Sequence, residues 1–151
     1  MRRVRIQSHA IIVALSTTVI TQSEGDTARS ARELAASLHA GDVVLLFGDL
    51  GAGKTAFVKG LAAGLGVAPQ EVSSPTFTIV QEYRGGRLTV FHVDLYRLND
   101  AREIEDLGLD EIAADGVLAI EWAEKLPRDV PGAIAVRIEH GDGDTRKITV
   151  G

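Results

Sequence analysis

The segment that most restricts the fold of this chain is GDLGAGKT, residues 48–55. Its glycines let the backbone adopt positive φ angles and bring several N–H groups onto one anionic group. The uniformly apolar run VVLLF (43–47) precedes it and predicts a buried strand of the parallel type. Apolar residues at helical spacing follow over 55–65. A strand, a glycine loop and a helix in this order predict a phosphate-binding loop, to which the helix N-terminus adds its positive dipole.

The remaining segments predict an α/β fold. Strands are expected at 14–20, 43–47 and 116–122, helices at 23–41, 55–65, 99–108 and 109–115, and hairpins at 76–83/88–94 and 133–140/146–150. Ser23 is the expected N-cap of the first helix, and Gly41 is expected to end it. Together these elements predict a P-loop NTPase-like sandwich, with a central mixed, largely parallel sheet flanked by helices and with β-hairpins.

Length and composition indicate a single domain over 1–151, with residues 1–15 as an N-terminal extension. The start of the chain has basic and apolar parts like a signal peptide, but Ser16, Thr17 and Thr18 interrupt the apolar run. No apolar run reaches the roughly 20 residues of a membrane span. The absence of cysteine excludes disulfides and thiol catalysis, and we expect a cytoplasmic protein. The net charge of −5 excludes a broad basic face that could hold nucleic acid unaided.

Two acidic residues are candidates for a magnesium site. Asp94 ends the apolar run LTVFHVD, and Glu121 ends the strand VLAIE. Mg²⁺ takes hard oxygen ligands, and the Thr55 hydroxyl is a third candidate ligand. Lys54 supplies a cation for the outer phosphates. The residues alone leave open which of Asp94 and Glu121 binds the metal directly and which orients an attacking water.

Three further side chains have roles that the pattern leaves open. Thr76, in SSPTF (73–77), follows a proline and could sense a γ-phosphate, as switch threonines do. Trp122 points away from the face of Glu121 unless the strand ends there, so both a nucleotide-side and a core position are compatible with its spacing. His92 alternates with Asp94, and a lone strand histidine favours a structural role.

GDLGAGKT, SPTFTIVQEY, FHVDLYRL, EIEDLGLDE and IEW, in this order and spacing, resemble the TsaE (YjeE) family over about residues 23–127. The resemblance implies binding of ATP and Mg²⁺ and slow ATP hydrolysis by the protein alone. It also implies TsaB and TsaD as partners, with TsaD transferring a threonylcarbamoyl group to an adenosine of tRNA. The protein would then contact tRNA only indirectly, through that complex.

The resemblance also implies roles for individual residues. Thr55 and Glu121 correspond to the family's magnesium ligands, and Asp94 corresponds to an acid needed for hydrolysis. Thr76 corresponds to a switch-like threonine. The implied nucleotide-binding set is Gly48, Asp49, Leu50, Gly51, Ala52, Gly53, Lys54, Thr55, Ala56 and Trp122, with Ser23 near the adenine.

Two alternatives remain compatible with the sequence. A small-molecule kinase would need an acceptor pocket and an arginine-bearing lid. A nucleotide-gated binding module would hydrolyse ATP only incidentally. A GTPase is disfavoured, because the only asparagine, Asn99, is followed by Asp100 and no N-K-x-D motif exists.

Overall fold

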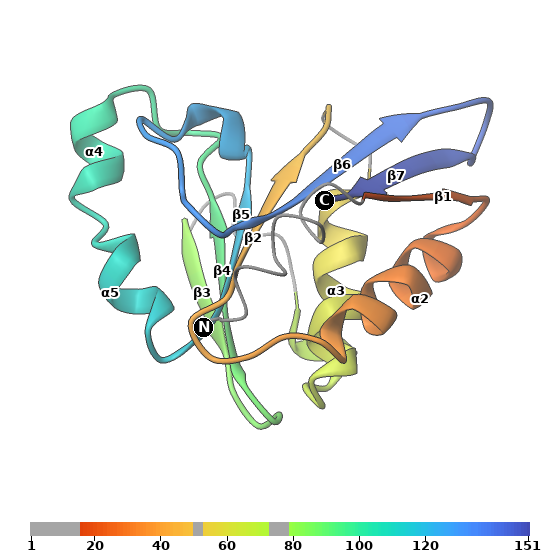
Figure 1. Ribbon diagram of the computed structural model, residues 1–151, viewed down its shortest axis with the longest axis horizontal. Coiled ribbons are helices and arrows are strands. Elements are labelled where there is room, and N and C mark those ends of the chain that lie inside the picture. Colours follow the sequence, from red (N-terminus) through yellow and green to blue (C-terminus); the bar gives the residue numbers. More distant parts are fainter. Residues whose placement is uncertain (1–15, 50–52, 73–78) are drawn as a thin grey trace.

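The structure is a computed structural model that describes residues 16–49, 53–72 and 79–151. These residues form one seven-stranded sheet with helices against both faces (Figure 1). The strands are β1 (Thr17–Thr21), β2 (Val43–Phe47), β3 (Val80–Tyr83), β4 (Thr89–Asp94), β5 (Gly116–Glu121), β6 (Ile134–His140) and β7 (Arg146–Val150). The helices are α2 (Glu24–Ala35), α3 (Lys54–Gly64), α4 (Ala101–Glu105) and α5 (Leu109–Ala113), with 3₁₀ turns at Pro69–Glu71 and Ala123–Lys125.

The sheet is parallel at its centre and antiparallel at its edges. Its strand order is β1-β7-β6-β2-β5-β4-β3, and the four strands β6, β2, β5 and β4 run parallel. At one edge β3 pairs antiparallel with β4, and at the other β7 pairs antiparallel with β6 and β1 with β7. The predicted mixed, largely parallel sheet and both predicted hairpins are therefore confirmed.

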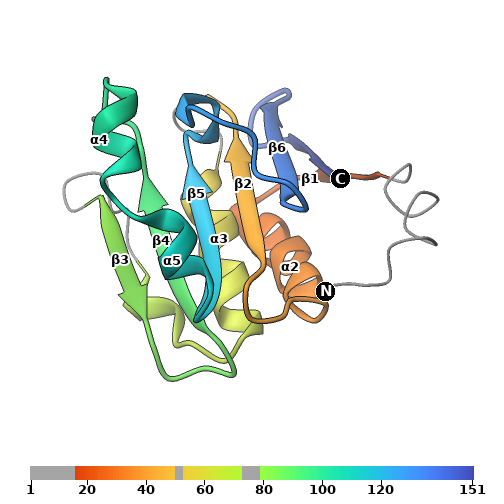
Figure 2. The same cartoon turned by 60° about the vertical axis from the view of Figure 1, so that its left-hand side comes forward.

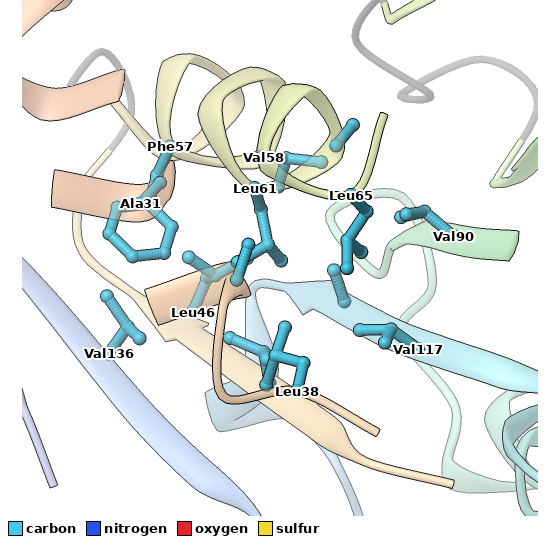
Figure 3. Packing of buried hydrophobic residues seen from close by; sticks show 14 of the residues in the cluster. Ala31, Leu38, Leu46, Phe57, Val58, Leu61, Leu65, Val90, Val117 and Val136 are labelled. Carbon is cyan, nitrogen blue, oxygen red and sulfur yellow. The ribbon is translucent and has the colours of Figure 1, made fainter. Parts of the chain in front are cut away.

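The two faces of the sheet carry separate hydrophobic clusters. On the first face, α2 and α3 cover β2, β5 and β6. Figure 3 shows Phe57 and Leu61 of α3, and Leu65 directly after it, directed at this face. On the second face, which Figure 2 turns forward, α4 and α5 cover a smaller cluster that includes Leu118 and Ile120 of β5. Alternate residues of each buried strand thus serve opposite faces.

Helices α2 and α3 pack at very short range because α3 carries glycine where the helices meet. A Cβ atom placed on Gly60 would lie 2.1 Å from the carbonyl oxygen of Ala28 in α2, and one on Gly64 would lie 2.6 Å from the Ala35 Cβ. No larger side chain fits at Gly60 without moving backbone. This close approach fixes the start of α2 beside the start of α3.

The first predicted helix was placed correctly at its start and wrongly at its end. Ser23 is the N-cap, as predicted, and its hydroxyl accepts from the Asp26 N–H at 3.0 Å. The helix ends at Ala35 rather than at Gly41. The Arg87 guanidinium, from the segment before β4, donates to the carbonyls of Ala35 (3.0 Å) and Leu38 (3.1 Å). These bonds satisfy the carbonyls that a longer helix would have used itself.

Within the described part of the chain, no helix combines the length and the apolar character that a membrane crossing requires.

Candidate functional site

The glycine-rich loop connects the end of β2 to the start of α3, as the sequence predicts. Gly53, the N-cap residue, has φ +108 and makes no side-chain cap, so the first N–H groups of α3 are not taken by a capping side chain. No acidic residue lies in the first turn of this 11-residue helix. Its amino end therefore offers amide donors and a positive dipole end. The predicted binding residues Leu50, Gly51 and Ala52 and the predicted switch-like Thr76 lie outside the described residues.

Lys54 is held inside this loop by the chain itself. Only 5% of the residue is exposed, and its ammonium donates to the carbonyl of Gly48 and, at 3.5 Å, to that of Asp49. The Nζ atom also lies 3.8 Å from the ring centroid of Trp122, in cation–π geometry. Burial lowers the pKa of Lys54, and the opposing effect comes from the carboxylates of Glu121, Glu124, Asp94 and Asp49. A buried ammonium in a carbonyl-lined bend suits the recognition of an anion.

Asp94 and Glu121 meet at the carboxyl ends of two neighbouring parallel strands. They are register partners across β4 and β5, and they are 3% and 4% exposed. Val90 and Ala119, on the same sides of their strands, belong to the cluster under α3, so both carboxylates face the loop helix. The Asp94 Oδ1 accepts from the Tyr96 N–H at 2.8 Å, which orients that carboxylate.

Thr55 connects the first turn of α3 to this acidic pair. Its hydroxyl donates to Glu121 Oε2 at 3.2 Å. A hydroxyl has one proton and two acceptor lone pairs, so once its proton is committed to Glu121 its oxygen can still bind a cation.

The donor set fits Mg²⁺, which prefers hard oxygen ligands and usually keeps several waters. A search of the described residues finds no group of three or more His, Cys, Asp or Glu residues suited to a metal.

Trp122 lies on the loop side of the sheet because β5 ends one residue before it. Its backbone has φ +59, an unusual value for a residue other than glycine, and this turns the chain out of the strand. The indole contacts Lys54 and lies 5.0 Å from the Tyr96 ring. It also packs partly against the second hydrophobic cluster. Trp122 therefore lies at the border between the loop and the hydrophobic core.

A hollow opens between the starts of α2 and α3. It has a volume of 260 Å³ and is lined by Glu24, Gly25, Ala28, Thr55, Ala56 and Lys59. The start of α2 therefore lies beside the start of α3. Ser23 itself does not line this hollow, since its hydroxyl caps α2. Glu24 and Gly25, the next two residues, do line it.

His92 has two polar partners that its place in the sequence does not indicate. The ring is fully buried, and its Nε2 lies 2.5 Å from Glu121 Oε2. Its Nδ1 lies 3.0 Å from the hydroxyl of Tyr83 on β3. The period-two spacing from Asp94 indicated the correct face of β4, but spacing alone gave no partner for the ring.

The chain is similar to known proteins of a single family. A family model described as "Threonylcarbamoyl adenosine biosynthesis protein TsaE" matches residues 21–148. The tRNA threonylcarbamoyladenosine biosynthesis protein TsaE of Bacillus subtilis (strain 168) is 45% identical over 131 residues, which are 85% of this chain and 81% of that protein. The protein of the same name from Treponema pallidum (strain Nichols) is 44% identical over 135 residues, 87% of this chain and 97% of that protein. The crystal structure of Bacillus subtilis YdiB matches with a TM-score of 0.70 and 37% identity, over 90% of this chain and 84% of that one.

Proposed function

Because this chain belongs to the TsaE family, we propose that it binds and slowly hydrolyses ATP with Mg²⁺ to support tRNA modification by a TsaB–TsaD complex. Proteins of this family take part in tRNA threonylcarbamoyladenosine biosynthesis. The observation that carries the ATPase part is the hydrogen bond from Thr55 to Glu121. It joins the first turn of the loop helix to a buried acidic strand end, and this is the arrangement that a metal-bound polyphosphate needs.

The loop would bind the phosphates through backbone amides and Lys54. Lys54 now donates to carbonyls of its own loop, and anionic phosphate oxygens are stronger acceptors than these. Because burial disfavours the charged form of Lys54, an anion placed beside the ammonium restores that form. Phosphate binding would therefore draw the Nζ atom away from its loop carbonyls and from the Trp122 ring.

Thr55 and Glu121 would hold the magnesium ion, as the family resemblance also implies. When bound, the ion supplies charge neutralisation of the β- and γ-phosphate oxygens. The role of the protein is to keep the Thr55 oxygen and the Glu121 carboxylate in one fixed arrangement. The bond between them does this in the described structure.

Asp94 would orient the attacking water. It is buried beside Glu121, and the Tyr96 N–H fixes one of its oxygens at 2.8 Å. A carboxylate held in this way can accept a proton from water and align its lone pair. The assignment divides the pair, with Glu121 on the metal side and Asp94 on the water side.

The nucleoside would lie at the hollow between α2 and α3, against Glu24 and Gly25. Its walls come from the first turns of both helices, and the wall from α3 includes Thr55 and Ala56 of the predicted set. A ligand whose phosphates occupy the loop would extend its nucleoside along this side of α3.

In a cytoplasmic complex, a partner would hold the tRNA, whose adenosine accepts the threonylcarbamoyl group. The net charge of −5 disfavours direct binding of nucleic acid. Tyr96, 44% exposed beside the site, is available to contact a TsaB–TsaD partner.

The 470 Å³ cavity on the second face, lined by residues such as Ile104, Leu118 and Pro131, is separated from the loop by the sheet. An acceptor pocket for a kinase would have to open on the loop side instead.

The deciding experiment measures ATP hydrolysis with and without TsaB–TsaD, and then tRNA threonylcarbamoyladenosine formation with this protein present or omitted. We expect the pair to raise the ATPase rate and the modification to need hydrolysable ATP. An unaltered rate combined with ATP-dependent complex formation would favour a binding module. Phosphorylation of a small metabolite would favour a kinase.

A further inference from the structure

A buried polar chain crosses three adjacent strands behind the candidate metal site. The Tyr83 hydroxyl on β3 lies 2.6 Å from Gln81 Oε1 and 3.0 Å from His92 Nδ1 on β4. His92 Nε2 in turn lies 2.5 Å from Oε2 of Glu121 on β5. Tyr83 is 5% exposed and His92 is fully buried. Buried polar groups cost free energy unless each has a hydrogen-bond partner. The polar contacts between Tyr83, His92 and Glu121 therefore hold the three strands at fixed positions.

The chemistry of the partners fixes the orientation of the imidazole. A carboxylate can only accept, so His92 Nε2 carries the proton that faces Glu121. The Tyr83 hydroxyl occupies the other ring nitrogen, and the two rings lie 5.8 Å apart with a tilt of 54°. The ring therefore has a defined partner at each end, as in histidines whose second nitrogen sets their orientation.

Glu121 receives two donors on the same oxygen. Thr55 Oγ1 and His92 Nε2 both approach Oε2, and among the described residues no hydrogen bond reaches Oε1. A carboxylate tethered on one oxygen from two directions cannot rotate about its last torsion without breaking both bonds. The tether leaves Oε1 as the oxygen available to a metal ion or to a metal-bound water.

We propose that His92, braced by Tyr83, is a positioning residue that sets the Glu121 carboxylate for the divalent cation of the nucleotide complex. The proposal rests on the proposed Mg²⁺–ATP function. A histidine that only filled the core would affect stability through its volume. The proposed role instead depends on the Nε2–H group of His92, and its loss would lower the affinity for the metal ion. Removing a supporting hydrogen bond of this kind typically lowers metal affinity about 10- to 100-fold.

The test separates the N–H group from the volume of the side chain. His92→Gln keeps an amide N–H₂ near the place of Nε2, whereas His92→Leu removes the donor. Tyr83→Phe removes the brace and keeps the ring. Val90→Ala, two residues along the same face of β4 and fully buried, is the matched control for a core defect without a lost donor. Each variant is assayed for ATP affinity in EDTA, for Mn²⁺ affinity of the ATP complex by electron paramagnetic resonance, and for thermal stability.

We expect His92→Leu to lower Mn²⁺ affinity about 10- to 100-fold while ATP affinity in EDTA is unaltered. His92→Gln should restore most of the Mn²⁺ affinity, and Tyr83→Phe should give a smaller loss. Val90→Ala should lower stability and leave Mn²⁺ affinity alone. The proposal is overturned if His92→Leu keeps the wild-type Mn²⁺ affinity, if His92→Gln loses as much as His92→Leu, or if Val90→Ala loses affinity equally.

A measurement on the wild-type chain covers the case in which His92→Leu does not fold. Nitrogen-15 NMR of the imidazole should show a slowly exchanging proton bonded to Nε2, and a ring without that proton would refute the proposal. Failure of the proposed function has a different signature, since the wild-type protein would then not bind Mn²⁺–ATP at all. Wild-type binding with no effect of any His92 variant would refute only the positioning role.

Discussion

Replacing Gly60 with alanine should destabilise this protein strongly, although alanine is the better helix former. The added Cβ would lie 2.1 Å from the Ala28 carbonyl oxygen and 2.6 Å from the Ala28 Cα. Ordinary contact begins at 3.4 Å, so α2 and α3 would have to separate by about 1.3 Å. The obstacle is backbone, which cannot rotate aside. Overpacking of a core costs about 1–3 kcal/mol and sometimes more, and a rigid obstacle favours the upper end.

Helix propensity offsets only part of this cost. Glycine is about 1 kcal/mol less favourable than alanine inside a helix, so the net loss for Gly60→Ala should be about 2 kcal/mol. For a chain of this size that corresponds to a fall in melting temperature of about 4–8 °C. The hollow between the two helices should also change shape, because Ala28 is one of its walls. ATP affinity should therefore fall together with stability.

The matched control is Gly25→Ala, at the exposed start of α2. The nearest atom to an added Cβ there is Ser23 Oγ at 3.6 Å, an ordinary contact, and the φ angle is not positive. This variant should gain about 0.5–1 kcal/mol. Thermal and urea unfolding of both variants checks the pair. If Gly60→Ala is as stable as the wild type, the two helices do not pack at the distance described and the argument is wrong.

The remaining predictions concern the loop and the acidic pair. Lys54→Met should weaken ATP binding by about 10- to 100-fold or more, because it removes a charge-assisted bond to phosphate, and a titration with labelled ATP checks this. The same variant should not lower the stability of the nucleotide-free protein, because burial disfavours the charged form of Lys54. Since the pKa of Lys54 is lower in the folded than in the unfolded chain, wild-type stability should rise with pH toward 10.5 relative to Lys54→Met, as urea unfolding at several pH values can show. Asp94→Ala should spare ATP binding and lower turnover about 10²- to 10⁴-fold, and normal turnover would place the water-orienting group elsewhere. ATP should alter Trp122 fluorescence, because phosphates draw Lys54 from its position 3.8 Å over the ring, and a flat titration would contradict this.

The sequence predicts best those elements whose boundaries depend on local chemistry. Strand β2 was predicted at its observed bounds, and α3 within one residue at each end. Both adjoin the glycine loop, where backbone conformation itself sets the boundary. The end of α2 was predicted wrongly. Two carbonyls there, of Ala35 and Leu38, accept from Arg87, which lies 52 residues from Ala35. No local pattern contains that information.

The same limit applies to the short helices of the second face. Asp100 caps α4, but the helix ends at Glu105 instead of continuing to Gly108. Gly108, with φ +66, instead begins α5 as its N-cap. A glycine after an apolar run predicts a chain reversal, and whether it follows one helix or precedes the next depends on the packing of both.

For the candidate site, strand register decides what the sequence can show. Asp94 and Glu121 are direct register partners, and two acids that each end an apolar run at the same sheet edge could be predicted to meet. His92 pairs in register with Ala119 on one side and with Gln81 on the other, so its contacts with Glu121 and Tyr83 are both diagonal. A diagonal contact needs both the register and a side chain long enough to reach two residues along the neighbouring strand. A shift of one residue in either strand pairing would turn Glu121 or Tyr83 to the other face of the sheet and would remove its contact with His92. The pairing of Asp94 and Glu121 can therefore be predicted from the strand ends alone. The contacts of His92 with Glu121 and Tyr83 depend on the register of three strands, which the sequence does not give.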